Sequence, residues 1–187
     1  MVNQSSPADL DVTAQAVRML TLYSLAEVQS GHASTIRVSA EGASFSVADD
    51  GRGHSVERTV LGLPYLPFIY THLAYPFGNS EGGPVQLHGL GLSLLNVLCS
   101  DLKITVNKEN QTLRMTYRSG HLCGEERACP TGFKGNEVSG TVHSRLQPYA
   151  TNSRRIEQWL MVVLACTPAL RLHFNGRELR TPPQGAA

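Results

Sequence analysis

The stretch SVADDGRG at residues 46–53 decides how the rest of the chain is interpreted. Alternating apolar residues lead up to Asp49, and Gly51 and Gly53 allow the chain to turn sharply after it. A strand that ends in this way delivers a carboxylate to the edge of a sheet. If that carboxylate is buried, it can accept the exocyclic amine of adenine. Taken alone, the motif is more often an ordinary Asp-Gly turn.

The segments before this stretch predict a helix and a hairpin. Residues 9–31 place apolar side chains at helical spacings between an acidic start and a closing glycine. Two alternating segments, 35–40 and 43–48, then flank Glu41-Gly42, which is typical of a β-hairpin. The motif carboxylate therefore follows the second strand of a hairpin.

A second glycine motif, LHGLG at residues 87–91, precedes a predicted helix that ends at Leu98. Glycines at a helix start expose backbone N–H groups, and the helix dipole adds partial positive charge, so the motif suits a phosphate group. A close-packing site is the alternative for the glycines. For His88 the alternative to a ligand role is a packed or capping residue.

The remaining elements favour an α+β fold. Segments 101–107 and 111–119 predict a hairpin, 132–137 is turn-rich, 140–146 and 170–174 predict strands, and 153–166 predicts a helix capped by Ser153. Glycines and prolines up to Pro84 indicate short helices and a mobile loop. Because hairpins outnumber βαβ units, we expect a two-layer sandwich in which helices cover one face of a mostly antiparallel sheet.

Composition narrows the classes of function. The 187 residues suit one domain over 10–180, with a flexible N-terminus at 1–9 and a disordered tail at 181–187. A net charge of +1 gives no support for direct nucleic-acid binding. Four cysteines without CxxC spacing make zinc unexpected, and no signal peptide or membrane-length apolar segment is visible. We expect a cytoplasmic protein.

Order and spacing together carry a resemblance. A helix, a strand pair ending in DDGRG, a loop, and LHGLG opening a helix resemble the ATPase domain of DNA gyrase B and topoisomerase IV. That family belongs to the GHKL superfamily, with histidine kinases, mismatch-repair proteins and heat-shock chaperones. Further similarity at Gly31-His32-Ala33, at 117–120 and at 139–142 extends the resemblance over residues 10–180.

The resemblance implies roles for individual residues. Asp49 would bind the adenine amine of ATP or ADP, with Thr141 beside it, and Gly53 would line the base pocket. Arg52 would lie along the adenine edge and be held by Glu27 of the first helix. The backbone N–H groups of the phosphate loop would surround the phosphates; its residues are Leu87, His88, Gly89, Leu90 and Gly91.

The sequence departs from the family where ATP would be hydrolysed. The position of the general base falls on Met19, that of the magnesium-binding asparagine on Tyr23, and that of a following aspartate on Ala26. Methionine accepts no proton and tyrosine offers magnesium no amide oxygen, so we expect no catalytic residues, no metal ligands and doubtful magnesium binding. We expect Tyr23 to fill the space of the metal and phosphate rather than to stack on the nucleotide.

Two further departures concern the lid and the assembly. The lid segment Leu73–Gly83 lacks the family's Gly-Gly-Lys, and no counterpart of the arm that joins gyrase subunits precedes the first helix. We therefore expect a monomer.

Three hypotheses remain open on the sequence. The first is an adenine-nucleotide binder that does not hydrolyse ATP. The second is an interaction or regulatory module that keeps only the fold and binds a protein partner. The third is an active ATPase with a relocated base, Glu57 or His54.

Overall fold

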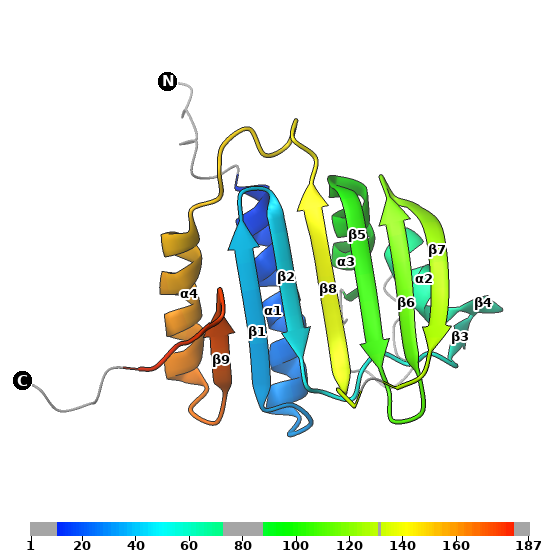
Figure 1. Ribbon diagram of the computed structural model, residues 1–187, viewed down its shortest axis with the longest axis horizontal. Coiled ribbons are helices and arrows are strands. Elements are labelled where there is room, and N and C mark those ends of the chain that lie inside the picture. Colours follow the sequence, from blue (N-terminus) through cyan, green and yellow to red (C-terminus); the bar gives the residue numbers. More distant parts are fainter. Residues whose placement is uncertain (1–10, 73–87, 131, 182–187) are drawn as a thin grey trace, which may run out of the picture.

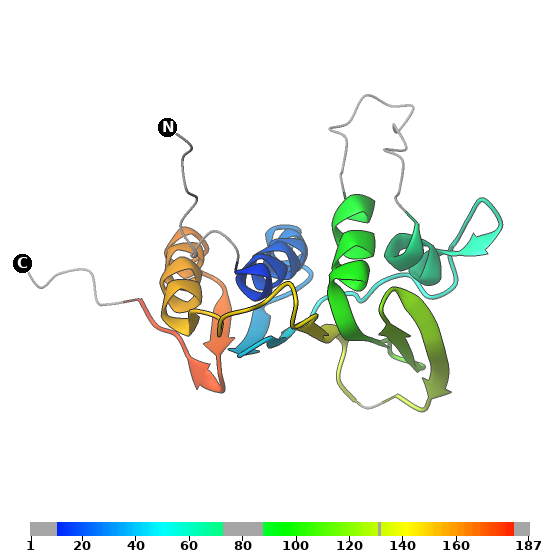
Figure 2. The ribbon, with the colours of Figure 1, turned by 90° about the horizontal axis from the view of Figure 1, so that it is seen from above.

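The computed structural model describes residues 11–72, 88–130 and 132–181. Within these ranges one large sheet has the strand order β10-β9-β1-β2-β8-β5-β6-β7, and its neighbouring strands are antiparallel except for β1 and β9. The helices all lie on one face of this sheet (Figure 1), as the view from above makes plain (Figure 2). The predicted α+β two-layer sandwich is confirmed.

The elements of the described residues follow the chain in a simple order. The helices are α1 (Val12–Gln29), α2 (Tyr65–Thr71), α3 (His88–Leu98) and α4 (Ser153–Cys166). The strands of the large sheet are β1 (Thr35–Glu41), β2 (Ser44–Asp49), β5 (Cys99–Asn107), β6 (Thr112–Arg118), β7 (His121–Ala128), β8 (Gly135–Val142), β9 (Arg171–Phe174) and β10 (Arg177–Glu178). A separate small hairpin joins β3 (Thr59–Val60) to β4 (Leu63–Pro64).

The core lies between the sheet and the helices. Strand β1 illustrates how the sequence selects the buried face, because Ile36, Val38 and Ala40 are buried while the residues between them are mostly exposed. Helix α1 turns the side of Val17 and Leu20 toward β1 and β2. Burial of this apolar surface is the main favourable contribution to folding.

Asp11 connects the start of α1 to the segment that precedes α4. It caps α1 by accepting the N–H of Ala14 at 2.9 Å, and it also accepts the hydroxyl of Thr151 and the N–H of Asn152. Burial opposes this charge, but the hydrogen bonds from Asn152, Ala14 and Thr151 leave the pKa of Asp11 below its usual value. One carboxylate thus joins the start of α1 to the segment that leads into α4.

Several predicted boundaries were wrong. Strand β7 was not predicted, because as an exposed edge strand it lacks the alternation of buried and exposed side chains that identifies a strand. Strand β8 begins at Gly135 rather than Gly140, so part of the predicted turn 132–137 is strand. Helix α4 is capped by the side chain of Asn152, which accepts the N–H of Arg155, rather than by Ser153.

Other expectations fall outside the described residues: the N-terminus 1–9, the lid Leu73–Gly83, Leu87 of the phosphate loop, and the tail from 182 onward. Among the helices that the structure does describe, none is both long enough and apolar enough to cross a membrane.

Candidate functional site

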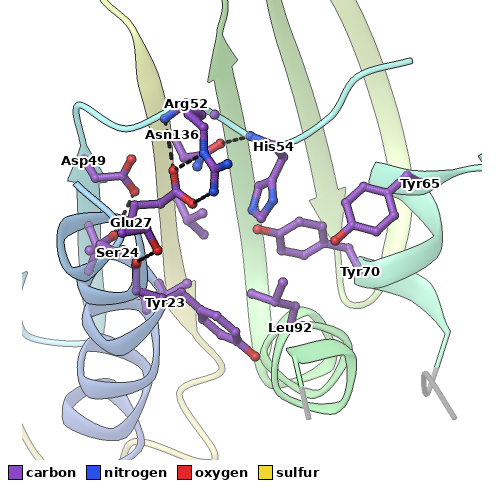
Figure 3. A pocket seen from close by; sticks show the side chains of 16 residues that line it. Tyr23, Ser24, Glu27, Asp49, Arg52, His54, Tyr65, Tyr70, Leu92 and Asn136 are labelled. Carbon is purple, nitrogen blue, oxygen red and sulfur yellow. Dashed lines mark hydrogen bonds and ion pairs between the residues drawn. The ribbon is translucent and has the colours of Figure 1, made fainter. Parts of the chain in front are cut away.

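A cavity of about 310 Å³ opens between α1, α2 and α3 at the end of β2 (Figure 3). Helix α1 contributes Tyr23, Ser24 and Glu27, strand β2 contributes Asp49, and strand β8 contributes Asn136 and Val138. The loop after β2 and helices α2 and α3 add further wall residues, among them Arg52, Gly53, His54, Tyr65, Tyr70 and Leu92. The hairpin motif and the first helix therefore meet at one site.

Asp49 is the buried charge of this cavity, with only 4% of the residue exposed. Its carboxylate accepts the hydroxyl of Ser24 at 2.9 Å, the N–H of Gly51 at 3.0 Å and the backbone N–H of Asn136. Burial raises the pKa of Asp49, and these three hydrogen bonds act in the opposite direction. The result is a preformed acceptor at the wall of a partly apolar cavity.

The predicted pairing of Arg52 with Glu27 is confirmed. Glu27 accepts three hydrogen bonds from Arg52, from its Nη2 at 2.8 Å, its Nε at 3.0 Å and its backbone N–H at 3.2 Å. These hydrogen bonds keep the pKa of Glu27 below its usual value. The ion pair fixes the loop after β2 to helix α1, and it largely neutralises the guanidinium.

Gly53 lies where a side chain would not fit. Its φ is +70°, and an added Cβ would be 3.2 Å from both the carbonyl oxygen of Asn107 and Cγ1 of Val106. The ammonium of Lys108 donates to the carbonyl oxygens of Arg52 (2.8 Å) and Gly53 (3.0 Å). This loop is consequently held against β5 and lines the cavity with its backbone.

The placement of Thr141 beside Asp49 was wrong. Strand β8 runs antiparallel to β2, so Thr141 pairs with Ser44 at the far end of β2, where their hydroxyl oxygens are 3.0 Å apart. The polar residue of β8 that reaches the cavity is Asn136, whose side chain accepts the N–H of His54 at 2.8 Å. The error follows from the late predicted start of β8, because five residues of strand displace a side chain by roughly 17 Å.

The structure shows a helix start at the predicted phosphate loop, and phosphate binding there stays a prediction. A helix does begin at His88, with Gly89 and Leu90 in its first turn, but Leu87 lies outside the described residues. An added Cβ on Gly91 would lie 2.6 Å from Sδ of Met19 and 3.0 Å from the hydroxyl oxygen of Tyr23. Helix α3 therefore packs at Gly91 directly on these two side chains of α1.

The sequence did not predict that Tyr65 and Tyr70 line the cavity. It singled out His54 only as a possible base, and not as part of the cavity wall. Tyr65 and Tyr70 belong to the seven-residue helix α2, in a segment whose prolines obscure any periodicity. The rings of His54 and Tyr65 are tilted, with centroids 6.4 Å apart. Spacing along the chain carries no signal for such a cluster, since the loop after β2 and helix α2 come together only in the folded chain.

Comparison with known proteins agrees with this architecture. The chain is 29% identical over 119 residues to the B subunit of DNA gyrase from Mycobacterium tuberculosis, covering 60% of this chain and 17% of that protein. It is 31% identical over 130 residues to the B subunit of DNA topoisomerase 4 from Mycoplasma pneumoniae, covering 65% of this chain and 20% of that protein. The corresponding topoisomerase protein of Pseudomonas aeruginosa is 33% identical over 132 residues, covering 65% and 19%.

Among solved structures, the 43K ATPase domain of Thermus thermophilus gyrase B in complex with an aminocoumarin superimposes with a TM-score of 0.73. The match covers 88% of this chain and 44% of that one, at 22% identity. This chain has the gyrase B ATPase-domain fold. Its homologues are the B subunits of gyrase and topoisomerase IV, and it spans about one fifth of their length. No protein-family model matches the chain.

Proposed function

We propose that this gyrase B-like chain binds an adenine nucleotide, ATP or ADP, in the cavity at Asp49 and does not hydrolyse ATP by the route that its resemblance implies. The buried carboxylate of Asp49 carries the proposal. An ionised carboxylate offers about four acceptor positions, and donors from Ser24, Gly51 and Asn136 fill three of them. One position is left for an N–H of the ligand, which the exocyclic amine of adenine supplies.

The remainder of the cavity suits a flat heterocycle. Val47, Leu92 and Val138 supply apolar wall, and the volume of about 310 Å³ lies at the small end of the range for small-molecule sites. A purine ring buried here would exchange water contacts for apolar ones, while Asp49 fixes its orientation.

The side chains of α1 do not support hydrolysis. Glu27 is the only glutamate on that helix, and its carboxylate already accepts hydrogen bonds from Arg52. A general base works best with a pKa near the working pH, whereas the ion pair moves the pKa of Glu27 in the opposite direction. Met19 and Tyr23, which pack on Gly91, provide neither a strong base nor a carboxylate or amide ligand for magnesium.

The test compares two neighbouring carboxylates by titration calorimetry with ADP. Asp49→Asn should weaken binding about tenfold or more, because the acceptor of the amine becomes an amide. Asp50→Asn is the matched control, since Asp50 hydrogen-bonds to Ser34 and Thr35 and does not line the cavity. Equal affinity of wild type and Asp49→Asn would contradict the proposal.

Steady-state ATP turnover with magnesium tests the second half of the proposal. We expect no turnover above background. Turnover that disappears in His54→Ala or Glu57→Gln would instead establish a relocated base.

A further inference from the structure

The hydroxyl group of Tyr70 is buried in the wall of the cavity without a hydrogen-bond partner among the described residues. The residue is 0% exposed, and its ring extends from α2 so that the hydroxyl points into the cavity, across from Asp49 (Figure 3). Leaving a buried hydroxyl unpaired is unfavourable, so native structures seldom do so without a reason. A bound ligand would supply the missing partner.

Tyr117 is a second buried tyrosine with which Tyr70 can be compared. Its hydroxyl is also buried and lacks a partner among the described residues, and the two rings are 6.1 Å apart. Tyr117 nevertheless does not line the cavity. Of these two tyrosines, Tyr70 alone combines an unsatisfied hydroxyl with a position in the cavity wall.

The charges around the cavity disfavour a phosphate chain. Its ionised lining side chains in the described residues are Glu27, Asp49 and Arg52, and Arg52 is paired with Glu27. The ammonium of Lys108 is directed to backbone carbonyl oxygens and lines a neighbouring cavity instead. Apart from the backbone N–H groups at the start of α3, the described residues that line the cavity therefore provide no surplus of positive charge for two or three phosphates.

The space beside α1 is also taken by neutral groups. Because Gly91 packs on the thioether of Met19 and the phenol of Tyr23, these side chains close the gap between α1 and α3 at that point. Burial raises the pKa of Tyr23, so its hydroxyl stays uncharged at neutral pH. A phosphate placed there would meet an apolar sulfur and an aromatic ring.

We infer that the cavity recognises the uncharged adenine nucleoside, its base at Asp49 and a second polar atom at the hydroxyl of Tyr70, and that the phosphate chain adds no affinity. This inference rests on the proposed function, since it assumes the adenine base at Asp49. Burial raises the pKa of Tyr70 as well, so the hydroxyl remains able to donate. The ligand class is therefore adenosine or any nucleotide that presents the adenosine half.

The first experiment is calorimetric titration of the full chain with adenosine, ADP and ATP, in EDTA and again with magnesium. The dissociation constants of the three should agree within about threefold in both buffers, since the phosphates contribute no net contact. ATP or ADP binding more than about threefold tighter than adenosine would overturn the inference while leaving the proposed function intact. If none of the three binds, the proposed function itself fails.

The second experiment compares Tyr70→Phe with Tyr117→Phe. Each substitution removes one buried, unpartnered hydroxyl, so neither should lower the melting temperature of the ligand-free protein. Tyr70→Phe should weaken adenosine binding about five- to tenfold, as expected for the loss of one hydrogen bond, whereas Tyr117→Phe should leave it unchanged. Unchanged adenosine affinity in Tyr70→Phe, or an equal loss in both variants, would overturn the role of Tyr70.

Discussion

At the scale of single residues, the site is organised around a carboxylate that its surroundings disfavour. Asp49 is 4% exposed, and burial raises its pKa while it faces Glu27 rather than a cation of its own. Hydrogen bonds from Ser24 and two backbone N–H groups compensate for part of the lost hydration. A residue kept at the expense of stability is typical of binding sites.

This imbalance predicts how Asp49→Asn changes the stability of the ligand-free protein. The folded-state pKa of Asp49 is raised, so the folded state binds the proton more tightly than the unfolded state. Ionised Asp49 therefore destabilises the fold at pH 7 to 8, and this effect vanishes as the pH falls toward about 4. Urea unfolding should find Asp49→Asn at least as stable as wild type at pH 8, with the difference shifting toward wild type at low pH. A variant much less stable than wild type at pH 8 would contradict this.

At the scale of elements, the position of Asp49 depends on how β2 meets β8. Gly135 begins β8 with φ +120°, and a Cβ there would overlap the carbonyl oxygen of Asp49. The absent side chain lets the two backbones approach, which in turn brings Asn136 into the cavity.

Gly135→Ala should therefore be strongly destabilising, by about 3 kcal/mol or more, because the clash involves backbone and the φ is strained for alanine. Gly124→Ala on strand β7 is the control. No atom lies within 4 Å of its added Cβ, so its effect should stay within about 1 kcal/mol. Chemical denaturation of both variants provides the comparison, and similar midpoints would count against the close approach at Gly135.

Asp11 acts between elements rather than within one. Asp11→Ala removes the N-cap of α1 and the links to Thr151 and Asn152, which should destabilise the protein by about 2 kcal/mol at pH 7. Because the folded pKa of Asp11 is lowered, its contribution is present above the unfolded value near 4 and is lost as the pH falls through the folded pKa. Unfolding measured at pH 7 and pH 3 should show the variant's deficit shrinking at the lower pH.

Asp101→Ala is the control for that measurement. Its carboxylate is 63% exposed and pairs with Arg118 at the surface, so a change within about 0.5 kcal/mol is expected. A loss as large as that of Asp11→Ala would show that capping is not the cause.

Comparison of sequence and structure separates what local pattern determines from what packing determines. Helix α1, the β1–β2 hairpin and the Arg52–Glu27 pair were predictable, because periodicity and the resemblance both specify them. Thr141 was misplaced because glycines within β8 look like turn residues. Gly140 is in fact needed in the strand, where a Cβ would be 3.0 Å from the ring of Phe45. No short-range signal reveals such a contact.

Tyr70 is a second residue whose role could not be predicted from the sequence. Its hydroxyl enters the cavity because α2 packs beside α3, and the side chain of Asn96 on α3 donates to the carbonyl oxygen of Tyr70. The two residues are 26 positions apart in the chain. The sequence predicts the fold class and the Asp49 end of the site. The wall formed by Tyr70 is known only from the structure.

At the scale of the whole molecule, the gyrase B-like fold encloses a cavity beside helix α1. Among the described residues, α1 contributes no carboxylate to this cavity that is free to act as a base for hydrolysis. The sheet places Asp49 and Asn136 side by side, and the loop held by Glu27 and Lys108 closes over them. Met19 and Tyr23 pack on Gly91. The account therefore makes nucleotide binding independent of the metal.

The most direct measurement is calorimetric titration of the full chain with ADP and with a non-hydrolysable ATP analogue, each with and without magnesium. The account predicts binding in the micromolar range whose dissociation constant does not change when magnesium is removed. Failure to detect heat at high ligand concentration, together with an unshifted melting temperature, would contradict it and would leave the fold as an interaction scaffold.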